Sequence, residues 1–190
     1  GLQELHIPAS VTTINAKAFQ GAALTSVEVP GTVKTLLDGA FMGCDDLRSF
    51  TLGEGSRSVP GGLLARCRSL ERVTLPQSLE TIGDSAFYEC PRLGEINIPD
   101  SVTTLGNSCF SGTSLRELTL PAGTTTIGNR AFAEMRYLRE LHIPDTVTSL
   151  GIGVFAGDSA LTTATLPSGL TEIPQSTFSF CEKLTSIEIP

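Results

Sequence analysis

The sequence contains no tryptophan, and no apolar run in it approaches the roughly 20 residues that a membrane-spanning helix needs. Its opening residues, GLQELHIPAS, lack the charged and apolar regions of a signal peptide. We therefore expect this chain to carry neither a membrane-inserted segment nor a targeting segment.

Positive charge is also scarce. The 13 lysines and arginines are outnumbered by 20 aspartates and glutamates, which gives a formal net charge of −7. Proteins that bind nucleic acid need clustered cations to neutralise phosphates, and here the cations are spread thinly along the chain. We expect no nucleic-acid partner.

Repetition, in contrast, is abundant. The stretch LETIGDSAFYECPRL (79–93) is followed 23 residues later by VTTLGNSCFSGTSL (102–115). Aligned on their leading leucines, the units begin at steps of 22 or 23 residues, at Leu2, Leu24, Leu47, Leu70, Leu93, Leu115, Leu138, Leu161 and Leu184. Residues 1–190 therefore form a single array of eight units and the start of a ninth.

Each unit predicts the same local structure. Alternation of apolar and polar residues, as in INIP (96–99), predicts a short strand with its apolar side inward. Proline then ends the strand because it has no N–H to donate, except in the third unit, where Gly53 stands instead. A second extended piece, such as VTTI (11–14), follows, and the hydroxyls at its third position could form a ladder between units.

The rest of the unit predicts a turn and one helical turn. Glycine is followed by Asp or Asn, which we interpret as a turn and a helix N-cap. The helical turn then buries a column of phenylalanines that Leu64 interrupts: Phe19, Phe41, Phe87, Phe110, Phe132, Phe155 and Phe178. No single unit can bury such a face alone, so the units must stack as a solenoid with a continuous phenylalanine spine.

The combined pattern resembles the BspA-type leucine-rich repeat of surface proteins from bacteria and some protists, over Leu2 to Pro190. The resemblance implies an α/β repeat solenoid: a right-handed, curved superhelix with a parallel β-sheet on its concave side and short helical turns on the other. It also implies a cell-surface or secreted location and a non-enzymatic, adhesin-like module that binds a protein partner such as a host extracellular protein. A structural spacer that projects another domain, with no ligand of its own, is the alternative.

The five cysteines leave two explanations open. Their odd number excludes a complete disulfide framework within the chain, and no short C-x-x-C pair suggests a metal site. Cys44, Cys67, Cys90 and Cys181 share one position in the unit, which favours buried thiols that pack as small apolar groups. Disulfides between adjacent coils are the alternative, since a spacing of roughly 4.8 Å lies within the range that a disulfide tolerates.

Catalytic arrangements are not indicated. The two histidines, His6 and His142, are six coils apart, which at the strand spacing amounts to roughly 30 Å. The GDSA sequences at Gly83 and Gly157 lack the strand–turn–helix context of a nucleophile elbow. We expect no enzymatic activity, no metal site and no organic cofactor.

The outward residues of the strands are the candidate partner-binding site. Unlike residues break the regular columns between the fourth and seventh units, at Arg72, Glu95, Asn97, Glu117, Thr119, Glu140 and His142. With no tryptophan in the chain, and with Tyr88 and Tyr137 off this face, a sugar-binding role is disfavoured.

Glu95, Glu117 and Glu140 stack in consecutive units, about 5 Å apart, where like charges repel. Two explanations stay open. Arg116 and Arg139 on neighbouring coils compensate them, or the three form an acidic stripe for a basic partner segment or a divalent cation.

Two further expectations concern irregular places. The third unit departs from the pattern, and its segment GEGSRS (53–58) is where we expect a local irregularity. Both ends keep the apolar core pattern without a polar cap, for example at Leu5 and Ile187. We therefore expect the chain to be a fragment of a longer array, with end-to-end self-association through its uncapped terminal repeats.

Overall fold

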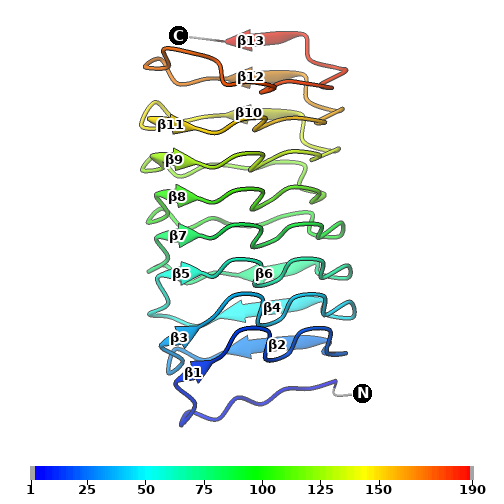
Figure 1. The fold of residues 1–190 in the computed structure, drawn as a ribbon, viewed down its shortest axis with the longest axis vertical. Helices are drawn as coiled ribbons and strands as arrows, with labels where there is room; N and C mark the ends of the chain where they lie inside the picture. Colours follow the sequence, from blue (N-terminus) through cyan, green and yellow to red (C-terminus); the bar gives the residue numbers. More distant parts are fainter. Residues whose placement is uncertain (1–2, 189–190) are drawn as a thin grey trace.

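The computed structural model describes residues 3–188, which wind into a stack of about eight coils (Figure 1). The coils follow the sequence from one end of the long axis to the other, so that each repeat contacts the repeats before and after it. Three positions of the predicted pattern, Leu2, Ile189 and Pro190, lie outside the described residues.

The first row of strands lies where the alternating pattern predicts it. The strands are β2 (Ser26–Val29), β4 (Ser49–Leu52), β6 (Arg72–Thr74), β10 (Glu140–His142), β12 (Thr163–Thr165) and β13 (Ser186–Glu188). All pairs are parallel, and their register equals the repeat step, as in Ser26 opposite Ser49. In β2 the burial alternates as predicted, with Val27 and Val29 inward.

This row is interrupted, which corrects the expectation of one continuous sheet. It consists of two three-stranded sheets, β2-β4-β6 and β10-β12-β13. The segments 95–98 and 117–120, which occupy the same place in the coils between them, are not assigned as strands. Two of the predicted strand positions in the candidate site therefore carry no strand ladder.

The second row of strands contains the second extended piece of each unit. The strands are β1 (Thr13–Ile14), β3 (Thr35–Leu36), β5 (Ser58–Val59), β7 (Thr81–Ile82), β8 (Thr104–Leu105), β9 (Thr126–Ile127) and β11 (Ser149–Leu150). They form the sheets β1-β3 and β5-β7-β8-β9-β11, so the row breaks between β3 and β5. Segment 53–58 lies at this break, and its Gly55 has a φ of 90°. The expected irregularity of the third unit is confirmed.

The predicted ladder of third-position hydroxyls is wrong. Within residues 3–188 these hydroxyls make no side-chain hydrogen bond, and the second position supplies such bonds instead. The hydroxyl of Thr103 donates to the carbonyl of Glu80 at 3.4 Å, and that of Thr125 donates to Thr103 at 3.3 Å. The third-position residues contribute their backbone to the strands of the second row.

The phenylalanine spine is confirmed. Both rows turn their apolar side chains into one core, and Phe41, Phe87, Phe110, Phe132 and Phe155 are fully buried there. Neighbouring rings stack, with centroids 5.3 Å apart for Phe87 and Phe110 and 6.3 Å apart for Phe110 and Phe132. Leu64 interrupts the row of rings but is fully buried at the same position.

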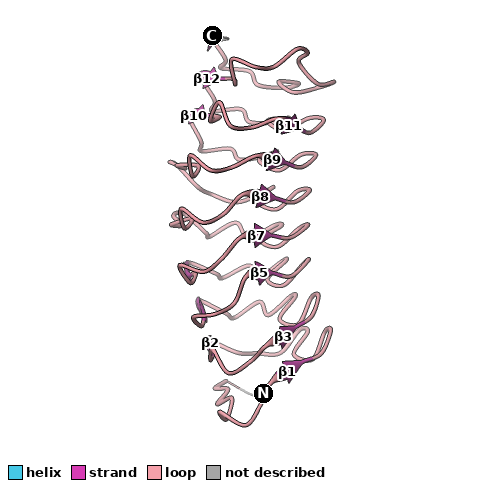
Figure 2. Ribbon diagram, turned by 90° about the vertical axis from the view of Figure 1, so that its left-hand side faces the viewer, coloured by secondary structure: helices cyan, strands magenta, loops and turns pink. Residues whose placement is uncertain are grey.

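The predicted helical turns are absent, and the described residues contain strands and loops only (Figure 2). In every coil the residues two before and two after the phenylalanine position have positive φ, as in Ser85 (56°) and Glu89 (53°) around Phe87. Left-handed residues at this spacing interrupt a right-handed helix. The amides instead donate between coils, as from Phe87 to the carbonyl of Cys109 at 2.9 Å.

The Asp and Asn residues after the glycine therefore cap no helix. They join one coil to the next, because the side chain of each accepts from a backbone N–H of the following coil. Asp84 accepts from Asn107 at 2.7 Å, and Asn107 accepts from Asn129 at 2.8 Å. The predicted N-cap is wrong because the donors that it would satisfy do not exist here.

The cysteines are free thiols, as the favoured explanation predicted. Each thiol of the shared column donates to a carbonyl of the preceding coil, as from Cys67 to Phe41 at 3.3 Å and from Cys90 to Leu64 at 3.1 Å. Burial raises the pKa of Cys90 to about 12, so this thiol stays protonated and remains a donor.

Candidate functional site

The predicted site residues all lie exposed on the face that bears the first row of strands, which we call the strand face. Arg72 lies on β6, and Glu140 and His142 lie on β10. The others lie on the two segments without a strand ladder: Glu95, Asn97, Glu117 and Thr119. The structure thus places the seven in consecutive coils, but no ion pair joins any two of them within residues 3–188.

The compensation that Arg116 and Arg139 could provide is not seen as ion pairs. In the described part of the chain neither arginine lies within ion-pair distance of the acidic stripe formed by Glu95, Glu117 and Glu140. The guanidinium of Arg116 lies instead over a tyrosine ring of the next coil. The carboxylates of the stripe are therefore left without a cationic partner among residues 3–188.

Metal ligands do not converge there. Among residues 3–188 no group of three or more His, Cys, Asp or Glu side chains could hold a metal ion. Nor does this part of the chain contain a helix long and apolar enough to cross a membrane. Of the two ligands considered for the acidic stripe, the basic partner segment is the one that we carry forward.

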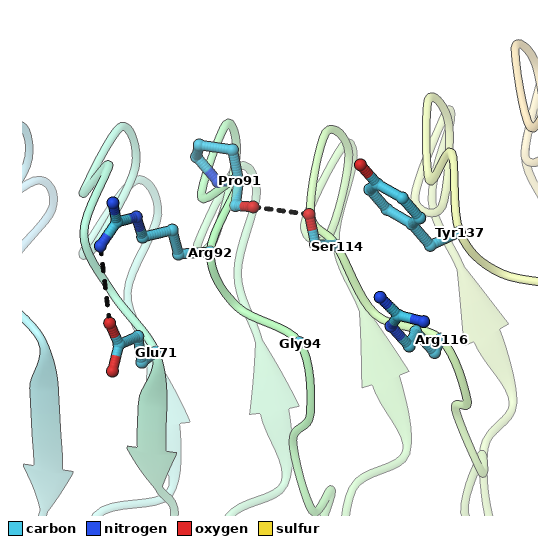
Figure 3. Close-up of a pocket in the computed structure, with 7 residues that line it drawn as sticks. All are labelled: Glu71, Pro91, Arg92, Gly94, Ser114, Arg116 and Tyr137. Atoms are coloured by element: carbon cyan, nitrogen blue, oxygen red, sulfur yellow. Dashed lines mark hydrogen bonds and ion pairs between the residues drawn. The ribbon is translucent and has the colours of Figure 1, made fainter.

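A second feature lies beside the strand face, where the turns lead into the first row of strands (Figure 3). Two adjoining depressions, of about 450 and 340 Å³, share Pro91, Ser114 and Tyr137. We call them together the flank hollow. Its other lining residues are Glu71, Glu89, Arg92, Gly94, Gly112, Thr113, Arg116, Glu134 and Arg136.

The flank hollow exists because one coil is short. From the phenylalanine position to the next leading leucine there are six steps in the units of Phe87 and Phe132, but five in the unit of Phe110. The shortened turn recedes between its neighbours. Gly94 then has no side chain where the adjacent coils carry Glu71 and Arg116, and the space around its Cα is open.

Several contacts arrange the walls of the hollow. The hydroxyl of Ser114 donates to the carbonyl of Pro91 at 2.5 Å and ties the short turn to the preceding coil (Figure 3). The guanidinium carbon of Arg116 lies 5.5 Å from the ring centroid of Tyr137. The tyrosine side of this pair is 52% exposed. A cation and an aromatic ring are thus held together at the surface.

Sequence reasoning missed this hollow, although two signals were visible. The step from Leu93 to Leu115 is 22 residues instead of 23, and Gly94 stands in a column of long polar residues. Each signal alone concerned spacing or size, whereas we searched for reactive groups. Tyr137 was excluded because it lies off the strand face.

A buried carboxyl lies inside the stack, one coil beyond the hollow. Asp158 occupies the cysteine position of its unit and has no exposed surface. Its Oδ1 accepts from the amide of Met135 at 2.9 Å, while Oδ2 has no hydrogen-bond partner in the described residues. Burial is the main cause that raises the pKa of Asp158, to about 9, and favours the neutral acid.

Comparison with protein families then identifies the array. The family model for the BspA type leucine-rich repeat region matches in six copies, over residues 1–116 and 103–190. The chain belongs to the BspA-type leucine-rich repeat family. A search of curated proteins found no match.

Solved structures share the fold of this BspA-type array. A leucine-rich repeat protein from Bacteroides ovatus is 26% identical, with a TM-score of 0.90 over 98% of this chain. The match covers 48% of that protein, so this chain spans about half of its length. The leucine-rich repeat protein of T. pallidum is 22% identical, with a TM-score of 0.57 over 87% of this chain and 70% of its own.

Within this BspA-type array, the acidic stripe and the flank hollow are adjacent but opposite in charge. The leading residues of the same coils supply both, since Arg116 and Glu117 are neighbours in the sequence. Because one strand position separates them, the first lines the hollow and the second lies on the strand face.

Proposed function

We propose that this BspA-type array is a non-enzymatic protein-interaction module of a cell-surface or secreted protein, which binds a macromolecular partner through its strand face. The observation that carries the proposal is the row of unpaired carboxylates at Glu95, Glu117 and Glu140, in a region where side chains of the described residues offer no cation. Like charges in a row cost free energy in the isolated chain, and a cationic partner would remove that cost.

The backbone of the same region supports the proposal. The acidic stripe runs over the two segments, 95–98 and 117–120, that are not paired as strands, whereas the coils on either side form regular sheets. Amide and carbonyl groups that no ladder occupies offer further hydrogen bonds to a partner. A basic, extended protein segment has both of the groups that this region could bind.

The groups that could carry out catalysis support a binding role instead. His6 and His142 are both exposed and lie on coils far apart in the stack. The thiols of Cys67 and Cys109 are buried, and burial raises the pKa of both well above the usual range, which disfavours the nucleophilic thiolate.

The experiment compares two triple variants that lose the same number of charges. In the first, Glu95, Glu117 and Glu140 are replaced by Gln; in the control, Glu4, Glu28 and Glu188, which lie on the same row of the stack, are replaced. Both are measured for binding to immobilised extracellular proteins and to a lysine-rich peptide. We expect the first variant to lose about tenfold in affinity, mostly in the association rate at low salt, and the control to change little.

Equal loss in both variants would show that only overall charge matters. If no extracellular protein and no basic peptide binds the unmodified chain, the spacer function takes the place of the binding function. The regular stacking of the spine supports the spacer as the second candidate, because an array of constant register is a rigid rod.

A further inference from the structure

We propose that the flank hollow is a second contact site, which receives an acidic segment of a partner protein. The proposal rests on the proposed function in one respect, since it assumes that the array binds a partner. It uses a different surface and the opposite charge. The two can therefore fail separately.

The first argument is the charge that remains after ion pairing. Three carboxylates border the hollow, and each is already paired with an arginine: Glu71 with Arg92 at 3.6 Å, Glu89 with Arg66 at 3.0 Å, and Glu134 with Arg130 at 3.4 Å. Arg116 and Arg136 line the hollow and have no ion pair within residues 3–188. Two guanidinium groups thus remain without an anion, on a chain whose net charge is −7.

The second argument is the position of Tyr137 between these two arginines. The chain contains one other tyrosine, Tyr88, which also has a guanidinium over its ring, that of Arg66 at 5.9 Å. That arginine is satisfied by Glu89. At Tyr137 the same arrangement lacks the carboxylate, so a partner can supply it.

The third argument concerns the kind of occupant. The two depressions adjoin through shared lining residues and extend across several coils, which suits a short stretch of polypeptide. Arginine and tyrosine are the side chains over-represented among the dominant residues of protein interfaces. A guanidinium also pairs with a carboxylate through two parallel hydrogen bonds.

Charge limits how acidic the occupant can be. The acidic stripe lies on the same coils, and Glu71, Glu89 and Glu134 border the hollow itself. A long polyanion would meet these carboxylates as well as the arginines. One or two acidic side chains opposite Arg116 and Arg136 would match the free cations without that repulsion.

The test measures direct binding of peptides to the unmodified chain. The probes are a ten-residue peptide of alternating Glu and Gly, its counterpart with Gln in place of Glu, and an oligosaccharide of uronic acids. The chain is compared with the double variant Arg116→Gln/Arg136→Gln and with the control Arg48→Gln/Lys183→Gln, which loses the same charge away from the hollow. Intrinsic tyrosine fluorescence reports on Tyr137, since the chain has no tryptophan.

We expect the acidic peptide to bind the unmodified chain and the control alike, and to bind the double variant about tenfold more weakly. The Gln peptide should bind none of them, and Tyr137→Ala should weaken binding of the acidic peptide. Failure of the acidic peptide to bind, or an equal loss in the control, would overturn the proposal. Stronger binding of the oligosaccharide, lost in the double variant, would also overturn it and assign the hollow to an acidic sugar.

These results are independent of the acidic stripe. The triple variant at Glu95, Glu117 and Glu140 keeps all residues of the hollow, so it should retain or improve binding of the acidic peptide. Loss of basic-peptide binding together with retained acidic-peptide binding would separate the two sites.

Discussion

At the scale of single residues, the phenylalanine position contributes most to the stability of the stack. Phe110 is fully buried and contacts rings in the coils before and after it. Phe110→Ala should therefore lower the free energy of unfolding by about 3–5 kcal/mol, because it removes a large apolar side chain and leaves a cavity. Urea denaturation measures the change.

Phe180→Ala is the matched control, since that ring is 81% exposed and lies outside the spine. Its replacement should change stability by less than about 0.5 kcal/mol. Similar losses at both positions would contradict the stacked spine.

Asp158 makes stability depend on pH. Its pKa is raised from 3.8 to about 9 in the folded protein, so the native state holds a proton that the unfolded chain releases above pH 4. Stability should accordingly be highest at low pH with respect to this group, and should fall as pH rises between about 4 and 9. At pH 7 the cost is at most about 4 kcal/mol.

Asp158→Asn removes the titrating proton while keeping an acceptor for the amide of Met135. The variant should be more stable than the unmodified chain at pH 8 and should lose most of the slope between pH 5 and pH 8. Denaturation at several pH values tests this. A flat profile in the unmodified chain would mean that Asp158 is ionised throughout.

At the scale of elements, the turns between coils depend on glycine for close approach. A Cβ added to Gly106 would lie 2.6 Å from the backbone nitrogen of Asp84 in the preceding coil, a distance that neither backbone can relieve alone. Gly106→Ala should destabilise the stack by about 1–3 kcal/mol and weaken the β7–β8 pairing next to it.

Gly123→Ala provides the comparison. The nearest atom to its added Cβ is 3.8 Å away, an ordinary contact, so its effect should be close to zero. Hydrogen exchange of the amides in β7 and β8 measures both the size and the place of the disturbance. Equal protection in the two variants would show that Gly106 is not a point of close approach.

The elements also show how far sequence reasoning reached. Period-two alternation predicted the first row of strands, and the aligned phenylalanines predicted the spine, because burial produces both patterns directly. The helical turn was wrong because its backbone depends on left-handed residues such as Ser85 and Glu89, which are not glycines and carry no strong preference. The flank hollow was missed because it results from an absent residue near Ser114 rather than from a motif.

At the scale of the whole molecule, the array is defined by what each coil offers to the next. Every described coil interior buries its apolar surface on two sides, and backbone amides join the coils through both rows and through the phenylalanine turns. The terminal coils have only one such neighbour within the chain. Their apolar groups therefore have surface left to bury.

The exposed apolar groups at the two ends predict end-to-end association. Near one end Ile187 and Phe180 are 39% and 81% exposed. At the other end Leu5 and Ile7 border a hollow of about 290 Å³ that is mostly apolar. Burying these surfaces against each other would continue the stack between molecules, since both present the side that another coil normally covers. Light scattering should show an average mass that rises with concentration, and a polar capping coil added to either end should keep the chain monomeric. A capped chain that associates as strongly as the uncapped one would show that the contacts lie elsewhere, and the strand face would then be the first surface to examine.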